Sequence, residues 1–315
     1  MAIAYIFPGQ GSQHPGMGKT LMDNFPAAQR VFEEVDEALS FPLSRLCFEG
    51  PPETLQLTEN TQPAILSVSV AVLRAMEAEG CSRPDYVAGH SLGEYSALVA
   101  AGSLSLADAA RTVRARGRYM QEAVPRGQGA MAAVIGAELS EIEEVCREAK
   151  QGQVCAPANI NSLKQVVISG NTEAVDRAIE RRKSGQEKGA KRVVKLSVSA
   201  PFHCALRMPA QKRLAADLEA LSFYDLLTPL VSNADAAEVR KAADARDSLV
   251  CQVSSPVRWL ESIELLIRQG IDTFVEVGPG RVLSGLMRQI NREVKSLNVE
   301  DTASLKSTCV NLGVS

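Results

Sequence analysis

The chain has 315 residues, 45% of them hydrophobic and 23% charged, which is ordinary for a globular protein with a sizeable core. The net charge of −3 gives no general case for nucleic-acid binding, and no apolar run reaches the roughly 20 residues that span a membrane. Seven cysteines without Cys-x-x-Cys pairs and an N-terminus without a basic leader indicate reduced thiols in the cytoplasm. The cysteines and the three histidines show no metal-ligand spacing, so we expect neither a metal nor a bound cofactor.

The first part of the chain predicts alternating strands and helices. Residues 2–7 form an apolar strand that leads into a glycine-rich loop at 8–13. Helices are expected at 24–39 and 62–80, and residues 41–61 between them are rich in proline and polar turn residues. The loop lacks the Lys-Ser/Thr ending of a phosphate-binding loop. It is therefore either a tight turn or a loop whose amides approach another ligand.

Residues 86–95 have the pattern of a nucleophile elbow. A strand of small residues leads to Ser91, Gly89 and Gly93 flank this serine two positions away, and a helix-forming run follows. In such a turn the hydroxyl projects outward, and the first amides of the helix point toward the group that it attacks. The alternative is an ordinary strand-to-helix turn in which the serine only caps the helix.

A predicted helix at 105–124 contains four arginines. At about 100° per residue, Arg111, Arg114 and Arg118 share one face, whereas Arg116 lies on the apolar face. A guanidinium in that position needs a partner that neutralises it. The partner is either a structural carboxylate or the carboxylate of a substrate, which the forked guanidinium can hold through two hydrogen bonds.

The pattern from 128 to 198 predicts a β-α-β-β-α-β unit, the ferredoxin-like arrangement. We expect strands at 129–135, 154–161, 165–169 and 192–198, and helices at 140–150 and 172–182. Ser140 and Glu143 predict a capping box at the start of the first helix. The chain is thus expected to form a large α/β domain (1–127 and 199–315) with an inserted subdomain (128–198) and a ligand cleft between them.

His203 directly follows this predicted subdomain. Among the other histidines, His14 lies in the glycine-rich loop, and His90 adjoins Ser91 in a turn that directs its side chain elsewhere. His203 could face Ser91 across the cleft and act as its base. The alternative is a structural histidine in the core.

The last part of the chain predicts further α/β structure. Helices are expected at 208–221 and 258–269, and a strand at 273–277 ends in Gly-Pro-Gly before another helix begins at Val282. The tail beyond Val294 is polar and is expected to be loosely held.

Six short motifs stand in order along the chain, at residues 7–13, 89–94, 116–120, 199–204, 252–257 and 276–280. Together they resemble malonyl-CoA:acyl carrier protein transacylases and the acyltransferase domains of fatty-acid and polyketide synthases, up to about residue 290. The resemblance implies an α/β fold: a hydrolase-like domain with a parallel sheet and a nucleophile elbow, plus the ferredoxin-like subdomain.

The resemblance also implies roles for matching residues. Ser91 would be the nucleophile, His203 its base, and Arg116 the ligand of the malonyl carboxylate. Phe202 and Leu92 are similar to residues of malonyl-selective members, and the bulk of Phe202 would crowd an α-methyl group.

Further roles concern the surroundings of the serine. The backbone amides of Gln10 and Leu92 would form an oxyanion hole, and Gln252 would orient the catalytic histidine through its backbone carbonyl. Asn159 or Asn161 would line the cleft, and the sequence leaves both open.

The implied reaction has two substrates, malonyl-CoA and holo acyl carrier protein, in fatty-acid biosynthesis. Malonyl-CoA acylates the serine, CoA leaves, and the phosphopantetheine thiol of the carrier takes the malonyl group. A monomer without nucleic-acid or membrane partners is expected. A basic segment is either a solvated loop or a docking patch for the acidic carrier, made of Arg181, Arg182, Lys183, Lys188, Lys191 and Arg192.

Two other classes of protein fit parts of the pattern. A serine hydrolase would use the same turn, but an α/β-hydrolase places an acid between serine and histidine, and none stands out here. A scaffold protein with a vestigial site would not need Ser91, Arg116 and His203 together. Labelling by a fluorophosphonate, which requires an activated serine, distinguishes the scaffold from the enzymes.

Overall fold

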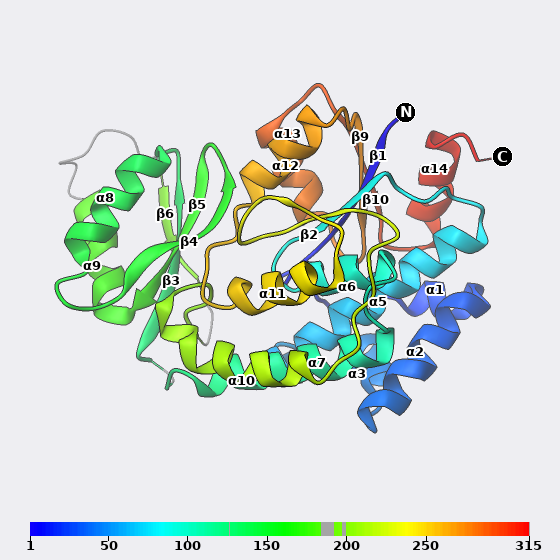
Figure 1. Ribbon diagram of the computed structural model, residues 1–315, viewed down its shortest axis with the longest axis horizontal. Helices are drawn as coiled ribbons and strands as arrows, with labels where there is room; N and C mark the ends of the chain where they lie inside the picture. The colour runs from blue at the N-terminus through cyan, green and yellow to red at the C-terminus, as the bar shows by residue number, and fades with distance from the viewer. Residues whose placement is uncertain (126, 184–191, 197–199, 315) are drawn as a thin grey trace.

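The fold contains two separate β-sheets (Figure 1). The computed structural model describes residues 1–314 except 126, 184–191 and 197–199. The larger sheet has six strands in the spatial order β10-β9-β1-β2-β7-β8. These strands are β1 (Ile3–Phe7), β2 (Tyr86–Gly89), β7 (Leu230–Val231), β8 (Glu238–Val239), β9 (Thr273–Val277) and β10 (Lys295–Val299). Only β7 and β8 pair antiparallel, so the sheet is mixed and mainly parallel, as an α/β fold requires.

Helices cover both faces of this sheet. Successive side chains of β1 point to opposite faces, so Tyr5 and Phe7 enter one core while Ala4 and Ile6 enter another. The first core is shared mainly with α2 (Pro26–Leu39), α5 (Thr58–Ala78), α6 (Gly93–Ala100), α7 (Leu106–Glu122), α10 (Met208–Glu219) and α14 (Thr302–Asn311). The second is shared with α12 (Trp259–Arg268) and α13 (Val282–Ile290). Burial on both faces explains why β1 is apolar throughout.

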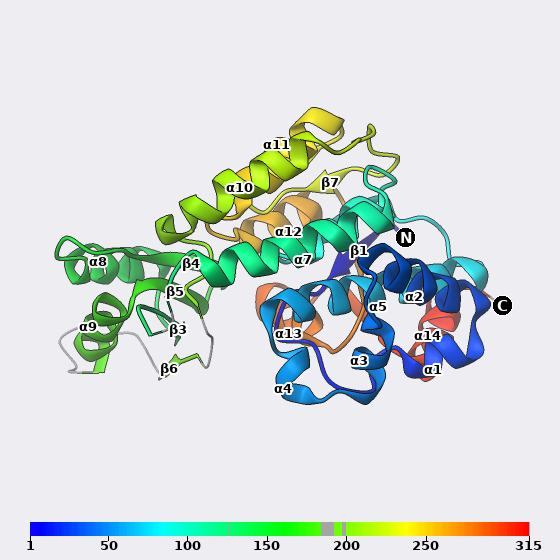
Figure 2. The same cartoon turned by 90° about the horizontal axis from the view of Figure 1, so that it is seen from below.

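The smaller sheet lies at one end of the molecule, at the left of Figures 1 and 2. It has the strand order β4-β5-β3-β6, and its neighbouring strands all pair antiparallel. Its elements in chain order are β3 (Gly129–Ile135), α8 (Leu139–Ala149), β4 (Cys155–Ser162), β5 (Gln165–Asn171), α9 (Thr172–Lys183) and β6 (Arg192–Lys195). The two helices cover one face, where Val134, Ile142 and Val175 form a core of their own.

Backbone hydrogen bonds join the smaller sheet to the rest of the chain. The amide of Val257 donates to Ala158 O at 2.8 Å, and the amide of Ile160 donates to Val257 O at 2.9 Å. Strand β4 is therefore held beside the start of α12, and its side chains can face the carboxyl end of the parallel sheet.

Five helices were not predicted from the sequence: α1 (Lys19–Asn24), α3 (Leu43–Glu49), α4 (Pro52–Leu55), α11 (Ala242–Gln252) and α14 (Thr302–Asn311). Two of them lie in the proline-rich part of the segment 41–61. Pro42 precedes α3, and Pro52 occupies the first turn of α4, where a missing amide hydrogen costs nothing. Proline here marks helix starts instead of turns.

Two predictions were wrong, one about the start of a helix and one about the C-terminal tail. The capping box at Ser140 does not form, because α8 already begins at Leu139 after Glu138, and no side chain caps it. The tail beyond Val294 is not loose, because β10 pairs with β9 and α14 buries Leu305 in the main core. A capping box does start α14, between Asp301 and Ser304.

Candidate active site

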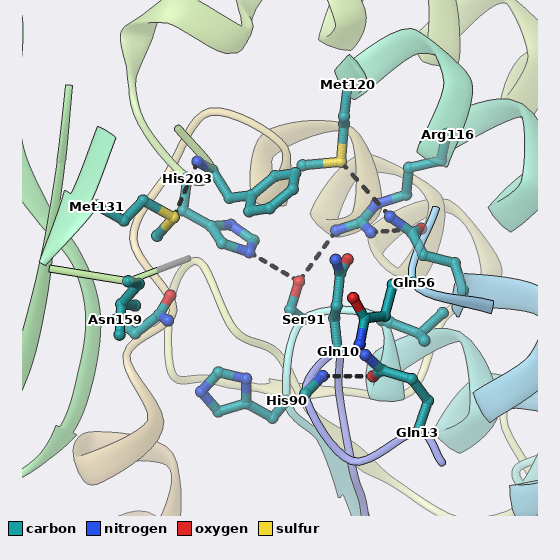
Figure 3. A pocket seen from close by; sticks show the side chains of 15 residues that line it. Gln10, Gln13, Gln56, His90, Ser91, Arg116, Met120, Met131, Asn159 and His203 are labelled. Carbon is teal, nitrogen blue, oxygen red and sulfur yellow. Dashed lines mark hydrogen bonds between the residues drawn. The ribbon is translucent and has the colours of Figure 1, made fainter. Parts of the chain in front are cut away.

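A cavity of about 480 Å³ lies between the two sheets (Figure 3). Its walls come from the loop after β1, the turn after β2, helix α7, strands β3 and β4, and the segment before α10. Ser91, Arg116 and His203 all line it. Segments far apart in the sequence thus meet at the carboxyl end of the parallel sheet, where α/β folds usually bind ligands.

Ser91 stands at the turn between β2 and α6 with a φ of +52°, a conformation that costs a non-glycine residue free energy. Glycines on either side make the turn possible. A Cβ on Gly89 would lie 2.0 Å from the Gly93 carbonyl carbon, and one on Gly93 would lie 2.1 Å from Phe7 O. The glycines of the motif are therefore required because the strand, the turn and the helix approach one another so closely.

This close approach predicts a large effect of Gly93→Ala on stability. The added methyl group meets backbone atoms that cannot move independently, so we expect a loss of about 3 kcal/mol or more in the free energy of unfolding. Gly285→Ala is the matched control, because that helical glycine is exposed and its added Cβ has open space. It should be neutral or stabilising by up to about 1 kcal/mol. Urea denaturation measures both, and equal effects would contradict the steric argument.

His203 also has a positive φ, +54°, and its ring points toward Ser91. The distance from Nε2 to Ser91 Oγ is 2.7 Å, and Nδ1 lies 3.0 Å from the backbone oxygen of Gln252. Because a carbonyl only accepts, Nδ1 carries the hydrogen and Nε2 is free to accept one from the serine. Burial, and secondly the charge of Arg116, lowers the pKa of His203 to about 3. The imidazole is therefore neutral at physiological pH and able to take a proton.

Arg116 is 1% exposed and forms no ion pair with any carboxylate in the described part of the chain. Its guanidinium donates to Gln62 Oε1 at 2.7 Å, to Gln252 Oε1 at 2.8 Å and to Ser91 Oγ at 3.1 Å. Burial lowers its pKa. The buried salt bridge considered as an alternative is thus not the arrangement found, and the cation faces the cavity with neutral partners.

The remaining predicted residues lie around this group. Gln10, Leu92 and Phe202 line the cavity. Within the described residues, neither the Gln10 nor the Leu92 backbone amide donates a hydrogen bond. Asn159 lines the cavity, whereas Asn161 Oδ1 accepts a hydrogen bond from His90 Nε2 at 2.9 Å.

Of the residues that hydrogen-bond to Ser91 or Arg116 in the described part of the chain, two were not found from the sequence. Gln62 holds the Arg116 guanidinium from helix α5. Asn233 accepts from the Ser91 amide at 2.6 Å and donates to Gly89 O at 2.6 Å, so it bridges the turn. Asn233 follows a strand of only two residues, and no local pattern marks it.

The predicted docking patch is only partly described. Lys188 and Lys191 lie outside the described residues, and for Arg182 and Lys183 the structure gives only their place in α9. Arg181 pairs with Glu148, and Arg192 is exposed at the start of β6.

The described residues contain neither a candidate metal-ion site nor a helix that could span a membrane. No group of three or more His, Cys, Asp or Glu side chains there could hold a metal ion. None of the helices described is both long and apolar enough to cross a membrane.

Residues 4–308 match the family model of the acyl transferase domain, and the chain therefore belongs to this family of acyltransferases. It is 48% identical to the malonyl CoA-acyl carrier protein transacylase of Bacillus subtilis (strain 168) over 305 residues, and this alignment covers 96% of this chain and 95% of that protein. The protein of that name from Escherichia coli (strain K12) is 47% identical over 288 residues, 91% of this chain and 92% of the relative.

Solved structures agree over the whole length. The acyl-carrier-protein-S-malonyltransferase of Bartonella henselae superposes with a TM-score of 0.96 at 46% identity and covers 100% of both chains. A malonyl-transacylase in complex with its holo acyl carrier protein from a type II polyketide synthase gives a TM-score of 0.95 at 44% identity, covering 99% of this chain and 100% of that one.

Proposed function

We propose that this acyltransferase transfers the malonyl group of malonyl-CoA to the phosphopantetheine thiol of holo acyl carrier protein, through a malonyl-Ser91 intermediate. The observation that carries the proposal is the position of Ser91 Oγ, 2.7 Å from a neutral imidazole and 3.1 Å from a buried guanidinium. The first group can take the serine proton, and the second can hold the free carboxylate of a malonyl group. The names of the relatives support the same substrate pair.

The first half-reaction transfers the acyl group to the enzyme. His203 Nε2 takes the proton of Ser91 as Oγ attacks the thioester carbonyl. The free amides of Gln10 and Leu92 would hold the developing oxyanion, each contributing about 3 kcal/mol to lowering the barrier. The tetrahedral intermediate then expels the sulfur of CoA, which receives the proton from the imidazolium.

The second half-reaction runs the same chemistry in the opposite direction. His203 accepts the proton of the carrier thiol, the sulfur attacks the ester carbonyl, and Ser91 leaves with the proton returned to it. The Gln252 carbonyl orients the imidazole throughout through Nδ1. A serine hydrolase uses an acid in that place. No metal or bound cofactor takes part in the proposed steps.

We further propose a structural division that matches these roles. The strand β2, Ser91 and helix α6 would form a nucleophile elbow on a large domain of residues 1–127 and 199–315. Residues 128–198 would form a ferredoxin-like small subdomain. The element order β-α-β-β-α-β and the antiparallel strand order β4-β5-β3-β6 support this division.

Intact mass spectrometry after brief exposure to malonyl-CoA tests the proposal, with acetyl-CoA in parallel and Ser91→Ala as the control. A malonyl adduct on the unchanged chain only, with little acetyl adduct, is the expected result. Equal acetylation would keep Ser91 as nucleophile but remove Arg116 as the selecting group. Release of malonate without an adduct would indicate a thioesterase, and no adduct with no turnover would indicate a scaffold.

Phe202 is proposed to exclude an α-methyl group from the cavity. The ring lines the cavity next to His203 and packs against the main core. Phe202→Ser should therefore raise kcat/KM for methylmalonyl-CoA relative to malonyl-CoA, by about tenfold for the space of one methyl group. Competition between the two thioesters measures the ratio. An unchanged ratio would remove Phe202 from the account of selectivity.

The basic segment is proposed to attract acyl carrier protein. Charge reversal at Arg181, Arg182 and Lys183 should raise the apparent KM for the carrier but not for malonyl-CoA, because only the carrier is a large acidic partner. The effect should weaken at high salt. Equal changes for both substrates would contradict the proposal.

A further inference from the structure

A buried glutamate lies one helical turn after the nucleophile. Glu94 on α6 is fully buried, and no Lys, Arg or His forms an ion pair with it within the described residues. The mechanism above does not use it. An unpaired carboxylate in a core is costly, so its hydrogen-bond partners explain how it is tolerated.

Three donors converge on this carboxylate. Gln252 Nε2 donates at 2.7 Å, Ser248 Oγ at 3.0 Å and the Asn233 amide at 3.2 Å. Burial raises the pKa of Glu94 to about 7, and these donors oppose that rise. The carboxylate is the common acceptor of helix α11 and of the segment after β7.

Two of these donors also hold the backbone of Ser91. Gln252 Nε2 donates to Ser91 O at 2.9 Å, and Asn233 Oδ1 accepts from the Ser91 amide at 2.6 Å. Both ends of the strained serine residue are thus bonded to side chains of residues that also donate to Glu94, Gln252 through the same side chain and Asn233 through its backbone amide. A positive φ persists in a non-glycine residue only where the surroundings fix it.

The same contacts determine which end of the Gln252 amide faces Arg116. The Ser91 carbonyl oxygen only accepts, and so does Glu94 when it is ionised, so the Gln252 NH₂ group faces both of them. Its oxygen then faces the guanidinium, from which it accepts at 2.8 Å. The amide therefore joins an anion to a cation without direct contact between them.

We propose that Glu94 is a positioning residue that fixes Ser91 through Asn233 and Gln252, and orients Arg116 for the acyl carboxylate through the Gln252 amide. The selectivity half of this proposal rests on the proposed function. In Glu94→Gln the side chain keeps its size but offers a donor as well as an acceptor. Gln252 can then turn its NH₂ group toward Arg116, which breaks its bond to Ser91 O and repels the cation.

The test compares malonyl-CoA with acetyl-CoA, which lacks the carboxylate. Glu94→Gln should lower the malonyl-to-acetyl ratio of kcat/KM about tenfold, and the additional effect should vanish in an Arg116→Ala background, as in a double-mutant cycle. Glu276→Gln is the matched control, because Glu276 is equally buried but, among the described residues, accepts from Leu283 and Ser284 and not from Asn233 or Gln252. It should leave the ratio unchanged.

Two further measurements keep each result interpretable. Fluorophosphonate labelling of Ser91 should slow in Glu94→Gln, and this readout does not depend on malonyl-CoA. If that variant fails to fold, Ser248→Ala, which removes one donor to Glu94, should lower the ratio about threefold. The proposal would be overturned if Glu94→Gln changed neither the malonyl-to-acetyl ratio nor the labelling rate. It would also be overturned if Glu276→Gln changed the ratio equally, or if Glu94→Gln kept its full effect in the Arg116→Ala background. Absence of any malonyl adduct on the unchanged chain would instead overturn the proposed function, and the labelling rate would still decide the role of Glu94 toward Ser91.

Discussion

Replacing His203 by alanine is expected to lower kcat for acyl transfer about 10³-fold, within the usual range for a general base. The imidazole Nε2 lies 2.7 Å from Ser91 Oγ, and no other titratable base is in contact with that hydroxyl among the described side chains. Stopped-flow release of CoA from malonyl-CoA measures the first half-reaction. His14→Ala is the control, because His14 is exposed. A loss below tenfold would remove His203 as the base.

The lowered pKa of His203 adds a pH signature to this prediction. The folded pKa of about 3 lies below the usual histidine value near 6.5, so the imidazole stays neutral across the intervening range. Fluorophosphonate labelling should therefore show no loss from imidazole protonation near pH 6.5. A loss there that persists in Glu94→Gln would contradict the assignment.

The same shift affects stability with a definite sign. Between about pH 3 and 6.5, His203 is protonated in the unfolded state but not in the folded state. The free energy of unfolding therefore rises with pH across this window, and this stability is lost as the pH falls through it. His90, whose pKa burial also lowers, contributes with the same sign. In His203→Ala the fall in unfolding free energy between neutral pH and about pH 4.5 should be smaller than in the unchanged chain, and urea titrations at both values measure it.

Arg116→Ala is expected to lower kcat/KM for malonyl-CoA about 10²- to 10³-fold, corresponding to roughly 3–4 kcal/mol for a lost buried partner of a carboxylate. Acetyl-CoA should be affected far less, because it has no charge to pair. The reason is geometric: the guanidinium is almost fully buried, touches Ser91 Oγ and has only neutral partners among the described residues.

Arg118→Ala controls for the loss of an arginine from the same helix. Arg118 is exposed and lies beside the Tyr119 ring instead of the cavity. It should leave both thioesters unaffected. If Arg116→Ala lowered the two rates equally, Arg116 would serve the folding of the site and not the choice of substrate.

Local sequence patterns were sufficient to predict those features of the site and the fold that depend on residues close together in the chain. The turn at Ser91 requires its flanking glycines because their Cβ atoms would overlap backbone, and that requirement is visible in five residues. Arg116 was found because a cation interrupts an apolar helix face, and it is indeed buried. The strand and helix pattern of 129–183 was also largely predicted, because β3 and β5 contain short buried runs and α8 buries residues at a helical period.

Other features depended on contacts between distant segments. The polar tail was misjudged because β10 is an edge strand with a partner on one side only, and such strands keep polar side chains. Asn233, Gln62 and Glu94 are linked to the site by hydrogen bonds across 54 to 158 residues of chain, and no sequence periodicity marks such bonds. The sequence by itself determined the nucleophile turn and the buried arginine, since both follow from local sterics and burial. Only the tertiary structure decided which neutral and acidic side chains hold them in place, because hydrogen-bond partners are chosen by proximity in space.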